Sequence, residues 1–265
     1  PWVMDADNEA DQKRMLTTFF DESAMDYRLA SQLKDLKDLQ NSDGSWSWWR
    51  GMRGSASITA QVLQTLARLN VMAGYQKATA KMIENGMDYL RTVVMKEFEE
   101  MKRMEKKGQK PMICDYHAIQ YLYINTLLGK NPFYDSDYVE LKNYLLKYLE
   151  ADRHRDIYSK ALMAVVLNGD GKAKKAKEYV ESIRQYTVTK PGMGTYFDTW
   201  HAGYSWFDYR IPTQTAAIEA LKAVDPADTE TINQMRLWLL QSKRTQAWDT
   251  LINLVKAVYG FLDGH

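Results

Sequence analysis

Residues 39–69 read LQNSDGSWSWWRGMRGSASITAQVLQTLARL, in which a turn and three tryptophans precede a helical pattern. The dipeptide Asp43-Gly44 is typical of tight turns. After the loop, apolar residues recur at steps of three and four, which predicts a helix with one buried face formed by Ile58, Val62, Leu63, Leu66 and Leu69. Tryptophan is costly to expose, and its N–H needs a partner when it is buried. The loop therefore either locks neighbouring helices together or grips a ligand.

The same order of an aromatic loop and an amphipathic helix occurs three times. The second copy has MGTYFDTWHAGYSWFDYR before PTQTAAIEALKAV, and the third has QSKRTQAWDT before LINLVKAVYGFL. When the three helices are aligned, their apolar positions coincide, as in the set Val62, Ala217 and Leu254. Recurring helix pairs that each bury one face on their neighbours predict a helical array. An array of this many helices has the length to close into a ring.

Helical periodicity also fills most of the remaining chain. It predicts a helical stretch over 11–40 with a break near 21–23, a long charged helix over 76–107, and shorter helices near 113–128, 136–150, 155–167, 172–186, 213–224, 228–241 and 250–262. The segment 188–206 has room for one short hairpin at most. No linker rich in Pro, Gly or Ser divides these helices. We therefore expect one all-α domain over 1–265, an α/α toroid of about ten to twelve helices.

The overall composition excludes several classes of partner. The formal net charge is +1, from 35 basic and 34 acidic residues, whereas proteins that bind nucleic acid or anionic membranes usually carry a basic excess. The sequence holds no run of about 18 apolar residues, so no transmembrane helix is expected. The single cysteine, Cys114, excludes an internal disulfide and a multi-cysteine zinc site.

We favour a structural role for the aromatic loops over ligand gripping. In a ring of helices, such loops lie at one end and wedge successive helices apart. The residues to which we assign this role are Gln40, Asp43, Gly44, Trp46, Trp48, Trp49, Trp206, Tyr209, Gln214, Trp248 and Asp249. Trp46 is expected to be the most buried of the three tryptophans in its loop. The Gln40 amide is expected to hydrogen-bond the backbone of this loop or the next.

Several stretches resemble known proteins. The pattern Gln40-x-x-x-Gly44-x-Trp46 is similar to the Gln/Trp motif of α/α-toroid proteins, a group with terpene cyclases, protein prenyltransferases and the thioester domains of complement-like proteins. Residues 39–69, 206–215 (WFDYRIPTQT) and 241–250 (QSKRTQAWDT) resemble the bacterial alpha-2-macroglobulin family. The opening PWVMDADNEADQKRM resembles the large alpha-2-macroglobulin-like proteins of Bacteroidetes. The resemblance is weakest over 75–190.

This resemblance implies an α/α toroid within a much larger periplasmic or cell-surface protein, of which the chain is a fragment. In the best-known members of that family, a protease cleaves a bait region, and an internal Cys-Gly-Glu-Gln thioester then acylates the attacker. This sequence has no Cys-x-Glu-Gln, and Cys114 lies in the unlike stretch MICDY. The thioester position is expected just before residue 1, so the thioester either precedes this sequence or has been lost, as in many bacterial relatives. We therefore expect a non-enzymatic domain that contributes to protease trapping or surface defence, with other domains of its chain and target proteases as partners.

Other chemistries remain as alternatives. Cys114, Asp115 and His117 are the ligand types of the prenyltransferase zinc site, although a site on one helix needs a ligand from elsewhere. Cys114 and His117 also have the composition of a nucleophile with its base. The aspartates that lie beside aromatic residues, as glycosidase carboxylates do, are Asp43, Asp198, Asp208 and Asp249.

Simpler structural roles account for these same residues. A cysteine in a helical stripe is usually buried, and aspartate before glycine usually tightens a turn. We therefore assign no catalytic residue, no metal and no cofactor. A carbohydrate-active toroid enzyme and a non-inhibitory interaction module remain the alternative functions.

Overall fold

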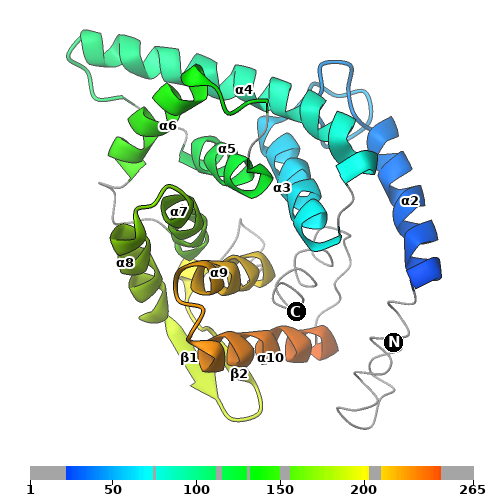
Figure 1. Cartoon of the computed structure of the whole chain (residues 1–265), viewed down its shortest axis with the longest axis vertical. Helices are drawn as coiled ribbons and strands as arrows, with labels where there is room; N and C mark the ends of the chain where they lie inside the picture. The colour runs from blue at the N-terminus through cyan, green and yellow to red at the C-terminus, as the bar shows by residue number, and fades with distance from the viewer. Residues whose placement is uncertain are drawn as a thin grey trace.

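The computed structural model describes residues 22–73, 76–111, 115–129, 132–149, 156–202 and 210–245, and these residues are mostly helical (Figure 1). The all-α fold class is therefore confirmed. The elements in chain order are α2 (Glu22–Asp38), α3 (Ala56–Ala73), α4 (Gln76–Lys106), α5 (Asp115–Leu128), α6 (Ser136–Leu149), α7 (Ile157–Gly169), α8 (Ala173–Arg184), β1 (Thr187–Lys190), β2 (Gly194–Phe197), the 3-10 helix η1 (Trp200–Ala202), α9 (Ile211–Val224) and α10 (Thr229–Thr245).

The helices alternate between an inner row and an outer row (Figure 1). In the inner row, α3 packs on α5, α5 on α7, and α7 on α9. In the outer row, α4 covers α3 and α5, α6 lies on α5, α8 covers α7 and α9, and α10 lies on α9. This alternation is what an array of helix pairs requires. Closure of the array into a complete toroid stays a prediction.

The amino-acid pattern explains which helices lie inside. The inner helix α7 has the apolar sequence IYSKALMAVVLNG and is buried over nearly all of its length, and α9 is buried at every position over 211–221. The outer helix α8 buries only a stripe at helical spacing, formed by Ala176, Tyr179, Val180 and Ile183. A helix with apolar residues on most of its surface must be packed against other helices on most sides, whereas a helix with one apolar stripe needs neighbours on one face only.

Three inner helices meet at a buried polar cluster made of Arg68, Tyr123 and Glu219, from α3, α5 and α9. Arg68 Nη2 lies 2.9 Å from Glu219 Oε2, and the Tyr123 hydroxyl donates to the same carboxylate at 2.6 Å. Arg68 Nε donates to the Tyr123 oxygen at 3.0 Å. The Arg68 side chain is fully buried. The cluster therefore fixes how α3 and α9, which are distant in sequence, face each other.

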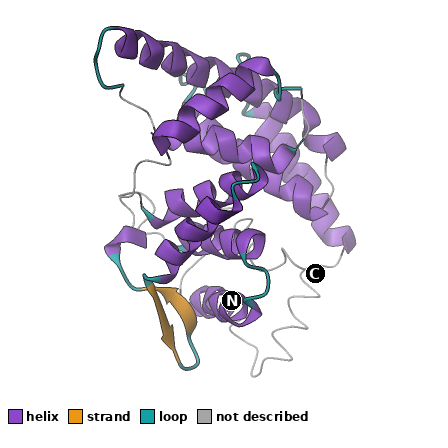
Figure 2. Ribbon diagram, turned by 60° about the vertical axis from the view of Figure 1, so that its left-hand side comes forward, coloured by secondary structure: helices purple, strands orange, loops and turns teal. Residues whose placement is uncertain are grey.

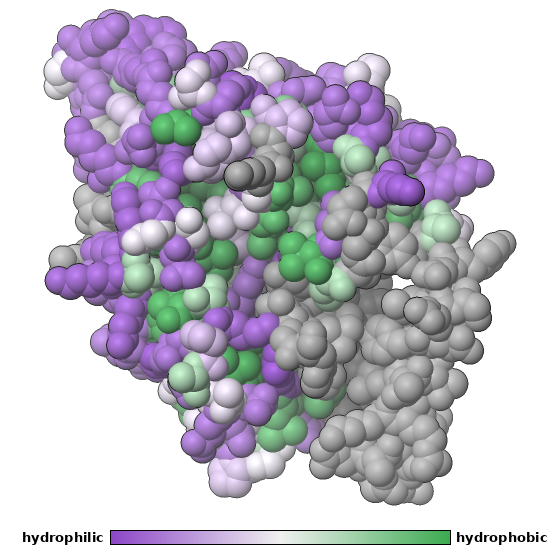
Figure 3. Space-filling model, viewed as in Figure 1, coloured by the Kyte–Doolittle hydropathy of each residue, from purple (hydrophilic) through white to green (hydrophobic). Residues whose placement is uncertain are grey.

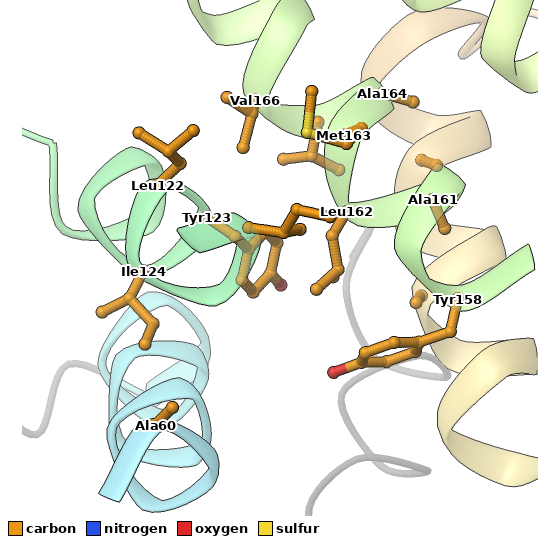
Figure 4. Packing of buried hydrophobic residues seen from close by; sticks show 14 of the residues in the cluster. Ala60, Leu122, Tyr123, Ile124, Tyr158, Ala161, Leu162, Met163, Ala164 and Val166 are labelled. Carbon is orange, nitrogen blue, oxygen red and sulfur yellow. The ribbon is translucent and has the colours of Figure 1, made fainter. Parts of the chain in front are cut away.

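A second set of buried polar side chains joins α3, α5 and α7. Gln120 Nε2 donates to the Tyr158 hydroxyl at 3.2 Å, and that hydroxyl donates to Gln64 Oε1 at 3.0 Å. Apolar side chains fill the space around these contacts, and Figure 4 shows Tyr123, Leu162 and Tyr158 pointing into it. The centre of the array is thus a packed core with polar ties between helices.

The helix boundaries agree with the sequence-based predictions to within a few residues for the helices near 113–128, 136–150, 155–167, 172–186, 213–224 and 228–241. The segment 187–197 forms one antiparallel hairpin, in which Thr187 pairs with Phe197 and Lys190 with Gly194, and it packs on α10 (Figure 2). The far end of α4 forms a hydrophilic tip (Figure 3), as its charged sequence predicts. The predicted helices before residue 22 and over 250–262 lie outside the described residues.

Candidate functional site

Trp46 forms a plug between the first helices of the array. Its side chain is buried, with an exposed fraction of 2%. The indole N–H donates to Leu36 O of α2 at 2.9 Å, and the main-chain N–H donates to Thr59 Oγ1 of α3 at 2.9 Å. The ring lies against Gly86 of α4, where an added Cβ would come within 2.9 Å of it. The expectation that Trp46 is the most buried tryptophan of its loop is confirmed.

Gly44 brings the loop backbone against α4. Its φ is +85°, and a Cβ at this position would lie 2.1 Å from Asn85 O, so both conformation and space require glycine. Gln40 Nε2 donates to Gly44 O at 2.9 Å and to Met82 O of α4 at 3.0 Å. One amide therefore ties the loop to the outer helix, and the expected hydrogen bond from Gln40 to its own loop is confirmed.

The same arrangement recurs at the hairpin before α9. Gly194 has a φ of +84°, and a Cβ there would lie 2.2 Å from Gln234 O of α10. Gln214 Nε2 donates to Thr195 O at 2.8 Å and to Met235 O of α10 at 3.1 Å. Tyr196 stacks on Trp238 with ring centroids 5.9 Å apart. Gly194-Thr195-Tyr196 thus repeats the structural role of Gly44-Ser45-Trp46, although Gln40 precedes its loop and Gln214 follows its own.

Trp48 and Trp49 take no part in the plug. Their exposed fractions are 66% and 70%, and Met52 beside them is half exposed. The loop that carries them is ordered by local bonds, since Ser47 Oγ donates to Trp49 O at 2.7 Å and the Met52 N–H donates to the same oxygen at 3.1 Å. We call the segment 48–53 (WWRGMR) the exposed tryptophan segment. Of the other residues assigned to aromatic loops, Trp206, Tyr209, Trp248 and Asp249 lie outside the described residues.

The aspartates of the glycosidase alternative have structural partners where they are described. Asp43 Oδ1 accepts from the Ser45 N–H at 3.0 Å and from the Ser45 hydroxyl at 2.6 Å, so it tightens its turn. Asp198 lies 3.5 Å from Arg210 Nη1. Asp208 and Asp249 are outside the described residues. In the described ranges, the aspartates that the sequence proposed therefore do not form a catalytic carboxylate pair.

The structure brings together three side chains that the sequence did not associate: Ser57, His117 and Glu97. Ser57 Oγ lies 2.9 Å from His117 Nε2, and His117 Nδ1 lies 3.5 Å from Glu97 Oε1. They come from the first turn of α3, the first turn of α5 and the C-terminal half of α4. No local spacing links them, because residues 20 to 60 positions apart meet only through helix packing.

The histidine of the zinc alternative is therefore placed between Ser57 and Glu97. Cys114 lies outside the described residues. Among the residues that are described, no group of three His, Cys, Asp or Glu side chains has the arrangement of a metal site. Within the same ranges, no helix combines the length and apolar character that a membrane crossing needs.

An open cavity of about 380 Å³ lies between α5, α6 and α7. Lys142 is paired with Asp170 there and donates to the Tyr134 hydroxyl at 3.3 Å. Burial raises the pKa of the Tyr138 phenol, which lines the same cavity. Burial alone would lower the pKa of Lys142, but the hydrogen bonds and charge interactions with Asp170 and Tyr134 together outweigh burial and raise that pKa. The lysine charge is thus already balanced within the protein.

Comparison with known proteins adds no assignment, because no family model matches the chain and no curated protein matches it.

We predict that Trp46→Ala lowers the free energy of unfolding by about 3–5 kcal/mol, because it removes a buried aromatic ring and its hydrogen bonds. Trp48→Ala and Trp49→Ala, which act on exposed side chains, should each change it by less than about 0.5 kcal/mol. Urea denaturation measures all three. If Trp46→Ala is as stable as the unchanged chain but no longer binds a sugar or a protein, the loop is a recognition surface and the structural role assigned to Trp46 is wrong.

The loop glycines Gly44 and Gly51 both have a left-handed backbone, with φ values of +85° and +83°. Replacing each by alanine therefore distinguishes the cost of backbone strain from the cost of a steric clash. A Cβ at Gly51 would meet nothing within 4 Å. Gly51→Ala should therefore cost only about 1–2 kcal/mol of unfolding free energy from the left-handed backbone. Gly44→Ala should cost roughly 1–3 kcal/mol more, because α4 must also move away. Equal denaturation midpoints for the two variants would refute the close approach to Asn85.

Proposed function

We propose that this chain is the thioester-domain-like part of a bacterial alpha-2-macroglobulin family protein that contributes to protease trapping at the cell surface or in the periplasm. The observation that carries the proposal is the loop of residues 40–46. Its family-like residues Gln40, Gly44 and Trp46 join α2, α3 and α4 through hydrogen bonds and close packing. A motif whose residues join three helices in this way supports a helical domain whose loops are structural. No thioester chemistry belongs to these residues, since Cys-x-Glu-Gln is absent.

The exposed tryptophan segment supports the second part of the proposal, which is contact with other domains of a longer chain or with a trapped protease. It carries Trp48, Trp49 and Met52 beside Arg50 and Arg53, all of them exposed. Trp, Met and Arg are enriched at protein interfaces, where Lys, Glu and Asp are depleted. Its backbone carries hydrogen bonds within the loop, from Ser47 and Met52 to Trp49 O. An exposed loop of this composition suits a protein partner.

The carbohydrate-active alternative gains no support from the described residues. Glycosidases need one carboxyl group to donate a proton and a second to act as base or nucleophile. Asp43 is instead occupied by both hydrogen-bond donors of Ser45, and Asp198 faces Arg210. We therefore keep the macroglobulin-like function as the proposal.

The decisive experiment uses the full-length protein that contains this chain. We incubate it with trypsin and expect casein hydrolysis to fall while cleavage of a small chromogenic peptide persists. The reason is that large substrates cannot reach the active site of a trapped protease, whereas small ones can. The Trp48→Ala/Trp49→Ala double variant should lose this protection and keep the melting temperature of its helical domain. Trp200→Ala is the matched control, because Trp200 is 79% exposed and lies outside the segment.

Two outcomes would contradict the proposal. The first is casein hydrolysis that the full-length protein does not change, and the second is glycan hydrolysis by the chain itself. The chain of residues 1–265 alone should form no adduct with methylamine, because it has no thioester.

A further inference from the structure

The hydrogen-bonded chain from Ser57 through His117 to Glu97 has the connectivity of an activated serine. His117 contacts the serine through one ring nitrogen and the carboxylate through the other, at 2.9 Å and 3.5 Å. When the Nδ1 proton points toward Glu97, Nε2 is left to accept the hydroxyl proton of Ser57. This is the order nucleophile, base, carboxylate that defines serine acyl transfer on unrelated folds.

The position of Ser57 on α3 supplies a second, independent feature. It is the second residue of the helix, where main-chain N–H groups point out of the helix end and the helix dipole is positive. Ser55 accepts hydrogen bonds from the N–H groups of Ile58 and Thr59. Among the described residues, none accepts from the N–H groups of Ala56 or Ser57. Main-chain N–H groups of a helix's first turn are the type of donor that stabilises an oxyanion, and here they belong to Ser57 itself and to the residue before it.

The three side chains are partly exposed to solvent, as attack on a small reagent requires. The His117 side chain is 17% exposed and the Glu97 side chain 33%, and Ser57 is only partly buried. His117 is therefore sheltered between helices yet reachable from solvent. The first-turn serine of another inner helix differs in this respect, because the Ser159 hydroxyl donates to Asp156 at 2.8 Å and has a carboxylate in place of a histidine.

We propose that Ser57 is a nucleophile that accepts the acyl group of small carboxylic esters, with His117 as its general base and Glu97 as a positioning residue. Ser57 Oγ bonds to the ester carbonyl carbon while its proton passes to His117 Nε2. The tetrahedral intermediate then expels the alcohol, which takes that proton, and leaves acyl-Ser57. Water, deprotonated by His117, releases the carboxylic acid and restores the serine hydroxyl.

This inference goes beyond the proposed function and differs from the sequence-based expectation that the chain has no catalytic residue. It does not depend on the macroglobulin resemblance, because it rests on three side chains and one helix terminus. Protease trapping by the full-length protein and acylation of Ser57 are separate measurements. Failure of one leaves the other unaffected.

The test is covalent labelling of the chain with a fluorophosphonate, in which the Ser57 oxygen forms a bond to phosphorus and fluoride leaves. We expect intact mass to increase by one phosphonyl group and peptide mass spectrometry to map it to Ser57. Turnover of p-nitrophenyl acetate should accompany the labelling. Ser57→Ala should abolish both, and His117→Gln should slow both about 100-fold or more.

The remaining variants distinguish chemistry from folding. Glu97→Gln should lower kcat for p-nitrophenyl acetate about tenfold without changing KM, because it removes the charge that balances the imidazolium. Ser159→Ala should label like the unchanged chain. The proposal is overturned if the folded chain takes up no label, if the label maps to a residue other than Ser57, or if His117→Gln labels at the original rate.

Discussion

The contact between Arg68 and Glu219 is the constraint on which the arrangement of helices depends. It joins two inner helices, α3 and α9, that are separated by most of the chain, and Tyr123 of α5 completes it. A buried charge without a partner is strongly unfavourable, so arrangements that separate these helices are penalised. Apolar packing alone is compatible with several relative positions of smooth helices. The polar cluster selects one of them.

The loops at Gly44 and Gly194, which we call the two glycine corners, position the outer helices relative to that inner arrangement. At each corner, a glycine backbone touches an outer helix, and one glutamine amide bridges the loop and that helix. Gln40 and Gln214 reach the same geometry from opposite sides of their loops. The two corners therefore resemble each other more closely in structure than in sequence. In the first corner, the main chain of Trp46 also hydrogen-bonds Ser55 and Thr59 on either side of the start of α3, where Ser57 lies, and the exposed tryptophan segment lies between Trp46 and Ser55.

Much of this fold follows from the sequence, since periodicity predicts the helices and a mostly apolar sequence distinguishes α7 from α8, which has a single apolar stripe. The burial of α9 is less evident, because its sequence also contains polar residues such as Gln214 and Glu219. The Asp-Gly turn also predicts the buried Trp46. Other features depend on three-dimensional packing and leave no local signal. The outward direction of Trp48 and Trp49 is one, because adjacent tryptophans look alike in sequence. The meeting of Ser57, His117 and Glu97 is another, because it needs three helices to be placed first.

A double-mutant cycle between Arg68→Met and Glu219→Leu, followed by urea denaturation, tests the central contact most directly. Each single variant should lose about 3–5 kcal/mol of unfolding free energy, because it leaves a buried charge without its partner. The double variant should lose at least about 2 kcal/mol less than the sum of the two. Losses that add to within about 0.5 kcal/mol would mean that the two side chains do not meet, and would contradict this arrangement of α3 and α9.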